Sequence, residues 1–289
     1  MEKIAWIGLG NMGVPMVKNL SRQGIAVTAY NRTQKQADAG NARTTVGVDE
    51  AVRGADVLFV MVSDGEAVRN VLFGVDGAVP HLEKGTAVVN MSTIGVDESK
   101  QLALDLAEHG VEFMDAPVIG SVQPARSAEL VVLAGGSEAT FKKLEPLLLT
   151  MSRSALYLGP VGSGAAMKLL VNAYLGSVVE TAAECMALGE KSGLGKGAFL
   201  EVLSETGMWS PILGAKQGMW QTGDYQAAFA LKHMTKDLGL MTRYATQLSA
   251  SVPSLFAVFS AYLAALGNDL AELDMAAVYQ QAARTAGTV

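Results

Sequence analysis

Short, almost wholly apolar runs recur through the first half of the chain and restrict its fold more than any other feature. They occupy residues 3–8, 25–30, 56–62, 86–91, 111–117 and 130–136. Continuously apolar runs of this length are typical of strands buried on both faces, as in a parallel sheet. The longer amphipathic stretches between them, such as residues 12–23 and 137–151, suit crossover helices. The pattern predicts a doubly wound α/β domain.

The pattern changes near Gly159. From Gly164 the chain runs for nearly thirty residues without a break, up to Gly193, which is a plausible helix stop. Apolar residues lie on all sides of the early turns, which predicts a buried helix, roughly 40 Å long at 1.5 Å per residue. Beyond it nothing has the pattern of a strand. We therefore predict an N-terminal α/β domain over residues 1–161, and over residues 162–289 a long connecting helix with an all-α domain.

Composition and charge exclude several classes of protein. Half of the 289 residues are hydrophobic and only 17% are charged, so a core is easily filled and some apolar surface is expected to be buried against a second chain. The net charge of −6 gives no support for a nucleic-acid partner. No uncharged apolar run approaches the ~20 residues that span a membrane, and the first strand begins too early for a signal peptide. The single cysteine, Cys185, permits no intrachain disulfide, which fits the cytoplasm.

A glycine-rich turn follows the first apolar run. In G-x-G-x-x-G the first glycine permits a tight turn, the second lets a pyrophosphate approach the backbone, and the third lets helix and strand pack closely. The N-terminus of the following helix offers N–H groups to the anion. With a strand before it and a helical pattern after it, the motif predicts a Rossmann-type dinucleotide site formed by Gly8, Leu9, Gly10, Asn11, Met12 and Gly13. The alternative is an ordinary strand–helix turn rich in glycine.

The end of the second apolar run favours NADP over NAD. In NAD sites an acidic residue about 20 residues after the glycines bonds the ribose 2′-hydroxyl. Here Asn31, Arg32 and Thr33 stand at that point. These side chains can donate hydrogen bonds to a 2′-phosphate, and the arginine adds charge. The alternative is a solvated turn.

Lys168 lies in the most apolar stretch of the chain, with Asn172 four residues later on the same helix face. Burial lowers the pKa of a lysine because it disfavours the charged form. Such a lysine can exchange a proton with a substrate oxygen near neutral pH. We therefore predict Lys168 and Asn172 as catalytic residues. The alternative is a lysine that reaches the surface from a helix end.

Other residues that could carry chemistry have simpler explanations. The three histidines are far apart and show no metal-ligand spacing, so no metal site is predicted. Cys185 has no activating neighbour, and we expect it to be buried in packing. Trp209 and Trp220 could line a pocket, but a core position is favoured.

With these motifs in hand, the sequence resembles the β-hydroxyacid dehydrogenase family, which includes 3-hydroxyisobutyrate dehydrogenases and glyoxylate/succinic semialdehyde reductases. The resemblance covers essentially the whole chain. Its marks are GLGNMG at 8–13, NMST at 90–93, DAPVIGS at 115–121 with PA at 124–125, GSGAAMK at 162–168 followed by Asn172, and FALKHMTKD at 229–237. The G-S-x-x-P-A form at 120–125 and the stretch FALKHMTKD at 229–237 are most similar to the glyoxylate/succinic semialdehyde reductase branch.

The resemblance implies roles for particular positions. Lys168 would be the proton donor or acceptor, with Asn172 beside it. Cofactor contacts beyond the glycine turn would come from Met61, Val62, Thr93 and Lys236. Substrate contacts would come from Ile119, Gly120, Ser121, Phe229 and Lys232, the last two from the all-α domain. A homodimer is implied as well.

Two departures from the family pattern bear on the substrate. Ile119 stands where the family usually has serine, so a hydroxyl donor to a substrate carboxylate is lost. Ala128 replaces a usual glycine. We predict an NADP(H)-dependent oxidoreductase that transfers a hydride between nicotinamide and a small carbonyl or hydroxy acid, such as a semialdehyde or keto acid. The alternatives are an imine reductase on the same scaffold, whose members usually lack the lysine, and a cofactor-binding module without catalysis.

Overall fold

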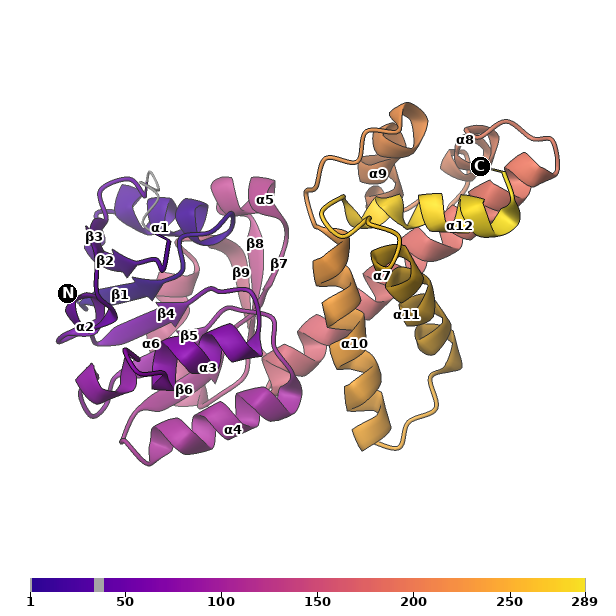
Figure 1. The fold of residues 1–289 in the computed structure, drawn as a ribbon. Helices are drawn as coiled ribbons and strands as arrows, with labels where there is room; N and C mark the ends of the chain where they lie inside the picture. The colour runs from indigo at the N-terminus through magenta and orange to yellow at the C-terminus, as the bar shows by residue number, and fades with distance from the viewer. Residues whose placement is uncertain (1, 34–38, 289) are drawn as a thin grey trace. The chain divides into compact units, whose positions relative to one another are not determined.

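The computed structural model describes residues 2–33 and 39–288. The chain divides into two compact units, Met1–Lys168 and Leu169–Val289. The first holds all the strands of the described residues, and the second is helical. In Figure 1 the first unit runs from indigo to magenta and the second from salmon to yellow.

The first unit is built on a six-stranded sheet in the order β3-β2-β1-β4-β5-β6, with every neighbouring pair parallel. Its strands are β1 (Ile4–Ile7), β2 (Val27–Tyr30), β3 (Arg43–Thr45), β4 (Val57–Val60), β5 (Ala87–Asn90) and β6 (Glu112–Asp115). β1, β4 and β5 are buried at every position, as their apolar runs predicted. The doubly wound Rossmann-type fold is confirmed.

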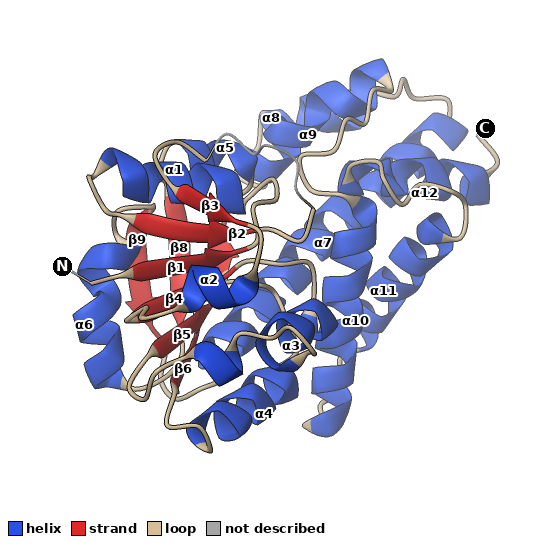
Figure 2. Cartoon of the chain, turned by 60° about the vertical axis from the view of Figure 1, so that its left-hand side comes forward, coloured by secondary structure: helices blue, strands red, loops and turns tan. Residues whose placement is uncertain are grey.

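Helices cover both faces of this sheet, which Figure 2 shows as red strands between blue helices. One apolar cluster contains core residues of α1 (Gly13–Arg22), α5 (Val122–Arg126) and α6 (Glu138–Leu148). The other contains core residues of α2 (Val48–Val52), α3 (Gly65–Phe73) and α4 (Val96–Ala107). Two separate cores explain why the central strands have no polar face.

The last apolar run, predicted as another strand, belongs to a second sheet. β8 (Leu130–Ala134) pairs in parallel with β9 (Ser152–Tyr157) and antiparallel with β7 (Val118–Ile119). The two sheets meet where the backbones of Asp115 and Gly135 exchange hydrogen bonds of 3.0 and 2.8 Å. β6 and β8 are thereby joined next to the start of the long helix.

The long helix, α7, spans Ser163–Lys191, 29 residues. A carboxylate from the sheet caps its N-terminus, because Asp115 accepts hydrogen bonds from the N–H groups of Gly162 and Ala165, both at 2.7 Å. Negative charge at a helix N-terminus is favourable. Gly193, at a φ of +86°, follows the helix end.

The prediction that α7 is buried on all sides is wrong for one face. Tyr174 and Leu188 are exposed, and Cys185, expected in the core, is exposed too. Together with Thr181 and Glu184 they recur at helical spacing, so they form one open stripe. No other described segment of the second unit covers that stripe.

The described part of the second unit also contains the short 3₁₀ helix η2 (Met275–Ala277) and the α-helices α8 (Ala198–Ser204), α9 (Pro211–Thr222), α10 (Leu231–Gln247), α11 (Pro253–Leu266) and α12 (Val278–Ala286). A buried ion pair joins α9 to the segment before α12, since the Lys216 ammonium lies 2.7 Å from the Asp274 carboxylate. Trp220 is fully buried, as favoured, and donates its indole N–H to the Ala276 carbonyl at 3.0 Å. None of the described helices is long and apolar enough to cross a membrane.

Glu180 should make folding stability depend on pH. It is a buried residue on α7, and burial, followed by the charge of Glu184, raises its pKa to about 7. In an unfolded chain the carboxyl ionises near pH 4.5, so above that pH the folded state either retains a proton or holds a buried charge. The contribution of Glu180 to the free energy of unfolding is therefore fully present below pH 4.5. It is lost as pH rises from about 4.5 to 7 and does not change further above that. Glu180→Gln should raise the thermal midpoint by about 2–5 °C at pH 8 and clearly less at pH 5. The exposed Glu205→Gln is the control, and equal shifts at both pH values would contradict the explanation.

Gly13 and Gly10 should differ sharply in their tolerance of a side chain. A Cβ on Gly13 would come within 1.9 Å of the Gly8 carbonyl oxygen, whereas one on Gly10 would meet no atom within 4 Å. Gly13→Ala should therefore lower the thermal midpoint by about 5–10 °C, because strand and helix must separate. Gly10→Ala should change it by no more than about 1 °C. Differential scanning calorimetry of both variants tests the difference, and equal midpoints would refute it.

Candidate active site

The glycine turn lies between β1 and α1, at the carboxyl edge of the sheet, where ligands of doubly wound folds bind. Gly8 has a φ of +103°, which favours glycine. A Cβ there would lie 2.1 Å from the Met61 carbonyl oxygen and 3.1 Å from a methyl carbon of Val62. The structure thus brings the predicted cofactor residues after β4 directly against the turn.

The turn presents a set of backbone donors. Within the described part of the chain, the N–H groups of Gly10, Asn11 and Met12 have no hydrogen-bond partner. They directly precede α1, whose N-terminus carries partial positive charge. Gly10 is exposed, and the space beside it is open. These residues fit the pyrophosphate of a dinucleotide.

Asn31 has a structural role that the sequence did not reveal. Its Oδ1 accepts the Leu9 N–H at 2.9 Å, and its Nδ2 donates to the Thr33 carbonyl at 2.7 Å. It therefore ties the end of β2 to the glycine turn. Arg32 and Thr33 are exposed beside it, and Arg32 is the one cation among the three predicted residues.

The loops after β4 and β5 are bonded to each other. Ser92 accepts the Val62 N–H at 2.9 Å, and its own N–H is donated to the side chain of Asn90 at 3.1 Å. Thr93, the residue predicted to contact cofactor, is half-buried next to Ser92. Asn90 and Ser92 thus position this loop, although the motif suggested only the role of Thr93.

The predicted substrate segment follows β7. Ile119 is half-buried at the end of that strand, Gly120 has a φ of +123°, and Ser121 precedes α5. Ala128 adopts a φ of +58°. That backbone conformation favours glycine, which gives a physical reason for the residue that the family usually has there.

Lys168 and Asn172 lie on α7, one turn apart, and both side chains are buried. Asn172 donates from Nδ2 to the Asp237 carboxylate at 2.6 Å. The other oxygen of Asp237 lies 3.1 Å from the Lys236 ammonium. Asp237 is the last residue of the motif at 229–237, and the sequence alone indicated no role for it. It joins Asn172, a predicted catalytic residue, to Lys236, a predicted cofactor residue.

Phe229 lies just before α10 and Lys232 lies in its first turn, and the two are held by different contacts. Asp274, fully buried, accepts the N–H groups of Ala228 and Phe229 at 3.0 and 3.1 Å, which fixes the Phe229 backbone. Lys232 donates to both carboxylate oxygens of Glu272 at 2.6 and 2.8 Å. A substrate that used the Lys232 charge would have to compete with this ion pair.

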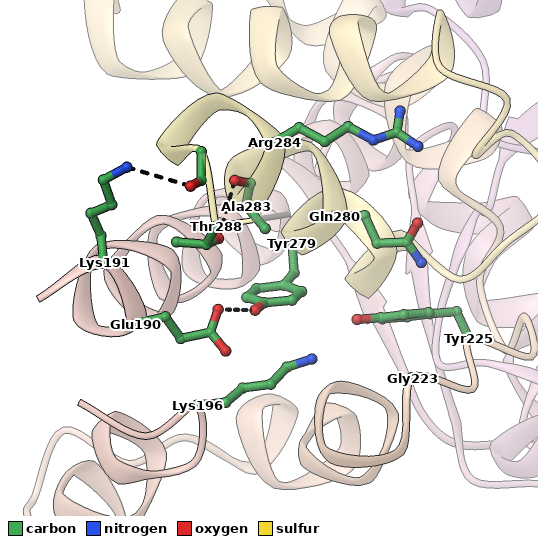
Figure 3. A pocket seen from close by; sticks show the side chains of 11 residues that line it. Glu190, Lys191, Lys196, Gly223, Tyr225, Tyr279, Gln280, Ala283, Arg284 and Thr288 are labelled. Carbon is green, nitrogen blue, oxygen red and sulfur yellow. Dashed lines mark hydrogen bonds between the residues drawn. The ribbon is translucent and has the colours of Figure 1, made fainter. Parts of the chain in front are cut away.

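An open pocket of about 830 Å³ lies on the second unit, and none of the predicted site residues lines it. Figure 3 shows Lys196, Glu190 and two tyrosines around it. The Tyr279 hydroxyl donates to Glu190, and the Lys196 ammonium lies 4.5 Å from the Tyr279 ring centre. The ends of α7, α9 and α12 border it, and its lining includes the cations Lys191, Lys196 and Arg284. Positive charge is favourable near the carboxyl end of a helix. Among the described residues, no group of His, Cys, Asp and Glu could hold a metal.

Two known protein families match successive parts of the chain. Residues 3–159 match the NAD-binding domain of 6-phosphogluconate dehydrogenase, and residues 162–282 match the NAD-binding family of NADP-dependent 3-hydroxyisobutyrate dehydrogenase. Chloroplastic glyoxylate/succinic semialdehyde reductase 2 of Arabidopsis thaliana is 34% identical over 280 residues, covering 96% of this chain and 78% of the relative.

Two further comparisons extend the likeness. The NAD-dependent L-serine dehydrogenase of Pseudomonas aeruginosa is 32% identical over 288 residues, covering 96% of this chain and 97% of the relative. Mycobacterium tuberculosis 3-hydroxyisobutyrate dehydrogenase, determined with L-serine, superposes with a TM-score of 0.86 at 28% identity, over 97% of this chain and 98% of that one. The chain therefore belongs to the 3-hydroxyisobutyrate dehydrogenase family, the β-hydroxyacid dehydrogenases, and is an oxidoreductase with a nicotinamide dinucleotide-binding domain.

Proposed function

We propose that this protein uses NADP(H) to transfer a hydride between nicotinamide and a small carbonyl or hydroxy acid, with Lys168 as the general acid and base. The observation that carries the proposal is the pair Lys168 and Asn172, buried on one face of α7, with the Asn172 amide held by Asp237. We assign cofactor binding to residues 1–161 and substrate contacts in part to residues 162–289.

The proposed roles of the chain's own groups follow from their positions. The nicotinamide, when bound, supplies or accepts the hydride. Lys168 gives a proton to the substrate oxygen during reduction and takes it back during oxidation. Asn172 has Nδ2 bonded to Asp237, so its amide is fixed in orientation and can hold the same oxygen. The cap by Asp115 fixes the start of the helix that carries both residues.

NADP is the proposed cofactor because Arg32 is exposed after β2, where NAD enzymes place a carboxylate. A relative is an NAD-dependent L-serine dehydrogenase, so family membership alone leaves the choice open. The positive charge of Arg32 favours the 2′-phosphate of NADP, and Asn31 contributes through its hydrogen bond to the glycine turn.

A carboxylate-bearing semialdehyde or keto acid is the proposed substrate class. Relatives are named for glyoxylate and succinic semialdehyde. Ile119 lacks the hydroxyl that the family usually offers, and a missing donor to a charged group costs roughly 1.5–3 kcal/mol. We therefore place glyoxylate below larger or less polar carbonyl compounds. A panel of aldehydes, keto acids and cyclic imines tests this ranking and separates the imine reductase and non-catalytic alternatives.

Lys168→Ala should lower kcat about 10²–10⁴-fold, the usual loss when general acid catalysis is removed. Its affinity for NADPH should stay unchanged, because the glycine turn and Arg32 lie on other elements. Lys168→Arg should be nearly as poor, since arginine does not release its proton near neutral pH, and Asn172→Ala should lose less. NADPH titration by fluorescence and kcat with the best substrate test this. More than about a tenth of wild-type kcat in Lys168→Ala would show that another group is the acid.

Arg32→Ala should raise the dissociation constant of NADPH about 10-fold or more, because a charged hydrogen bond to the 2′-phosphate is lost. The dissociation constant of NADH should hardly move, since NADH has no such phosphate. Arg53→Ala, which removes an exposed arginine after α2, is the matched control. If both cofactors weaken equally, or the wild type prefers NADH in kcat/KM, the NADP proposal is wrong.

The open apolar faces of the second unit support a homodimer. Phe256 and Leu263 are exposed on α11, and Tyr174 and Leu188 on α7. Exposed apolar stripes of this kind mark contacts with another chain. Light scattering after size-exclusion chromatography should give twice the 30.2 kDa chain mass. The mass of a single chain at micromolar concentration would contradict it.

A cytoplasmic location is also proposed, because the chain has a single cysteine and so no intrachain disulfide.

A further inference from the structure

The peptide between Gly8 and Leu9 is held at both ends. Its carbonyl oxygen, on Gly8, accepts the indole N–H of Trp6 at 2.8 Å. Its N–H, on Leu9, is donated to Oδ1 of Asn31 at 2.9 Å. Gly8 has a φ of +103°, so this peptide sets the direction of the glycine turn.

Trp6 is well placed to hold that carbonyl. It is fully buried in β1, and its ring stacks on Phe59 with centroids 5.3 Å apart. Gly8 is buried as well, and no backbone N–H of the described residues bonds its carbonyl. A buried carbonyl without a partner is destabilising, so without the indole N–H this peptide would be more stable if it rotated toward solvent.

Such a rotation would disturb the donors of the cofactor site. The N–H groups of Gly10, Asn11 and Met12 follow the fixed peptide directly. The Gly8 carbonyl oxygen also fills the place that a Cβ on Gly13 would take, 1.9 Å away, so it sets how closely α1 approaches β1. The indole bond therefore acts on both the direction of the donors and the packing of the helix that follows.

We propose that Trp6 is a positioning residue of the dinucleotide site: its indole N–H and the Asn31 side chain together lock the Gly8–Leu9 peptide in the orientation that presents the turn's N–H groups to a pyrophosphate. The inference rests on the family's nicotinamide dinucleotide-binding domain. It depends neither on the choice of NADP over NAD nor on the role of Lys168. Binding to a pre-organised turn avoids the ordering cost that a mobile turn would carry.

The test measures cofactor binding to the full-length protein by calorimetry, with NADP⁺ and NAD⁺ separately. Trp6→Phe removes the donor. Replacement of Trp6 by benzothienylalanine, in which sulfur takes the place of the indole N–H, removes it with little change of shape. Both should raise the dissociation constants of both dinucleotides about 5- to 30-fold, because the buried Gly8 carbonyl is left without its partner. The kcat at saturating cofactor should stay within about twofold.

Phe59→Leu is the matched control, since it loosens the same ring stack and leaves the indole N–H in place. It should change the dissociation constants by less than about twofold. An increase as large as that of the benzothienylalanine protein would show that packing alone matters, and an unchanged constant in the benzothienylalanine protein would show that the bond does not. Either result overturns the proposal.

Asn31→Ala gives a second, independent measurement. It frees the other end of the same peptide, so the losses from Trp6→Phe and Asn31→Ala should be non-additive in the double variant. Fully additive losses would mean that the two side chains act on separate features, and the proposed common lock would be wrong.

Discussion

The Asp115 carboxylate is the group on which the arrangement of the first unit depends. The backbone of Asp115 joins β6 to β8, and its two carboxylate oxygens accept N–H groups at the start of α7. The start of α7 packs closely against β8, because a Cβ on Gly164 would lie 2.2 Å from the Leu133 carbonyl oxygen. Burial raises the pKa of this carboxyl, and the backbone N–H groups oppose that rise. The helix that carries Lys168 and Asn172 thus has a starting point set by the sheet.

A second buried carboxylate plays the same part in the other unit. Asp274 accepts N–H groups from Ala228, Phe229 and Ala276, and pairs with Lys216. Asp115 accepts backbone N–H groups at the start of α7, and Asp274 accepts those of the segment before α10, in each case from far along the sequence. A buried charge is tolerated only when it is fully bonded, so each carboxylate fixes its surroundings closely. Neither interaction could be read from spacing, because the partners lie about 45 to 50 residues apart.

This separation explains what the sequence could and could not predict. β1, β4 and β5 were predictable because burial on both faces leaves a continuous apolar run. β3, with the sequence RTT and two exposed positions, and β9, largely half-buried or exposed, have no such run. The run at residues 130–136 predicted a strand correctly but gave no sign of its sheet, since a buried strand has the same composition in either. Gly8 and Gly13 were readable because sterics demand glycine there, whereas the bond from Asn31 to Leu9 depends on sheet register.

The residues of the candidate active site fall into those that hold the framework in place and those that do not. Trp6, Asn31, Ser92 and Asp237 act by holding backbone or other side chains, so their effects should reach the cofactor or substrate only indirectly. No hydrogen bond or ion pair joins the side chains of Arg32 and Ile119 to these groups in the described structure, although the backbone of Ile119 pairs with Val131. Under the proposed function, they are therefore the positions where a change of side chain should alter the choice of cofactor or substrate with the least effect on the fold. The departure from the family at Ile119 falls on such a position, whereas Ala128 carries a backbone strain, at a φ of +58°, that belongs to the architecture.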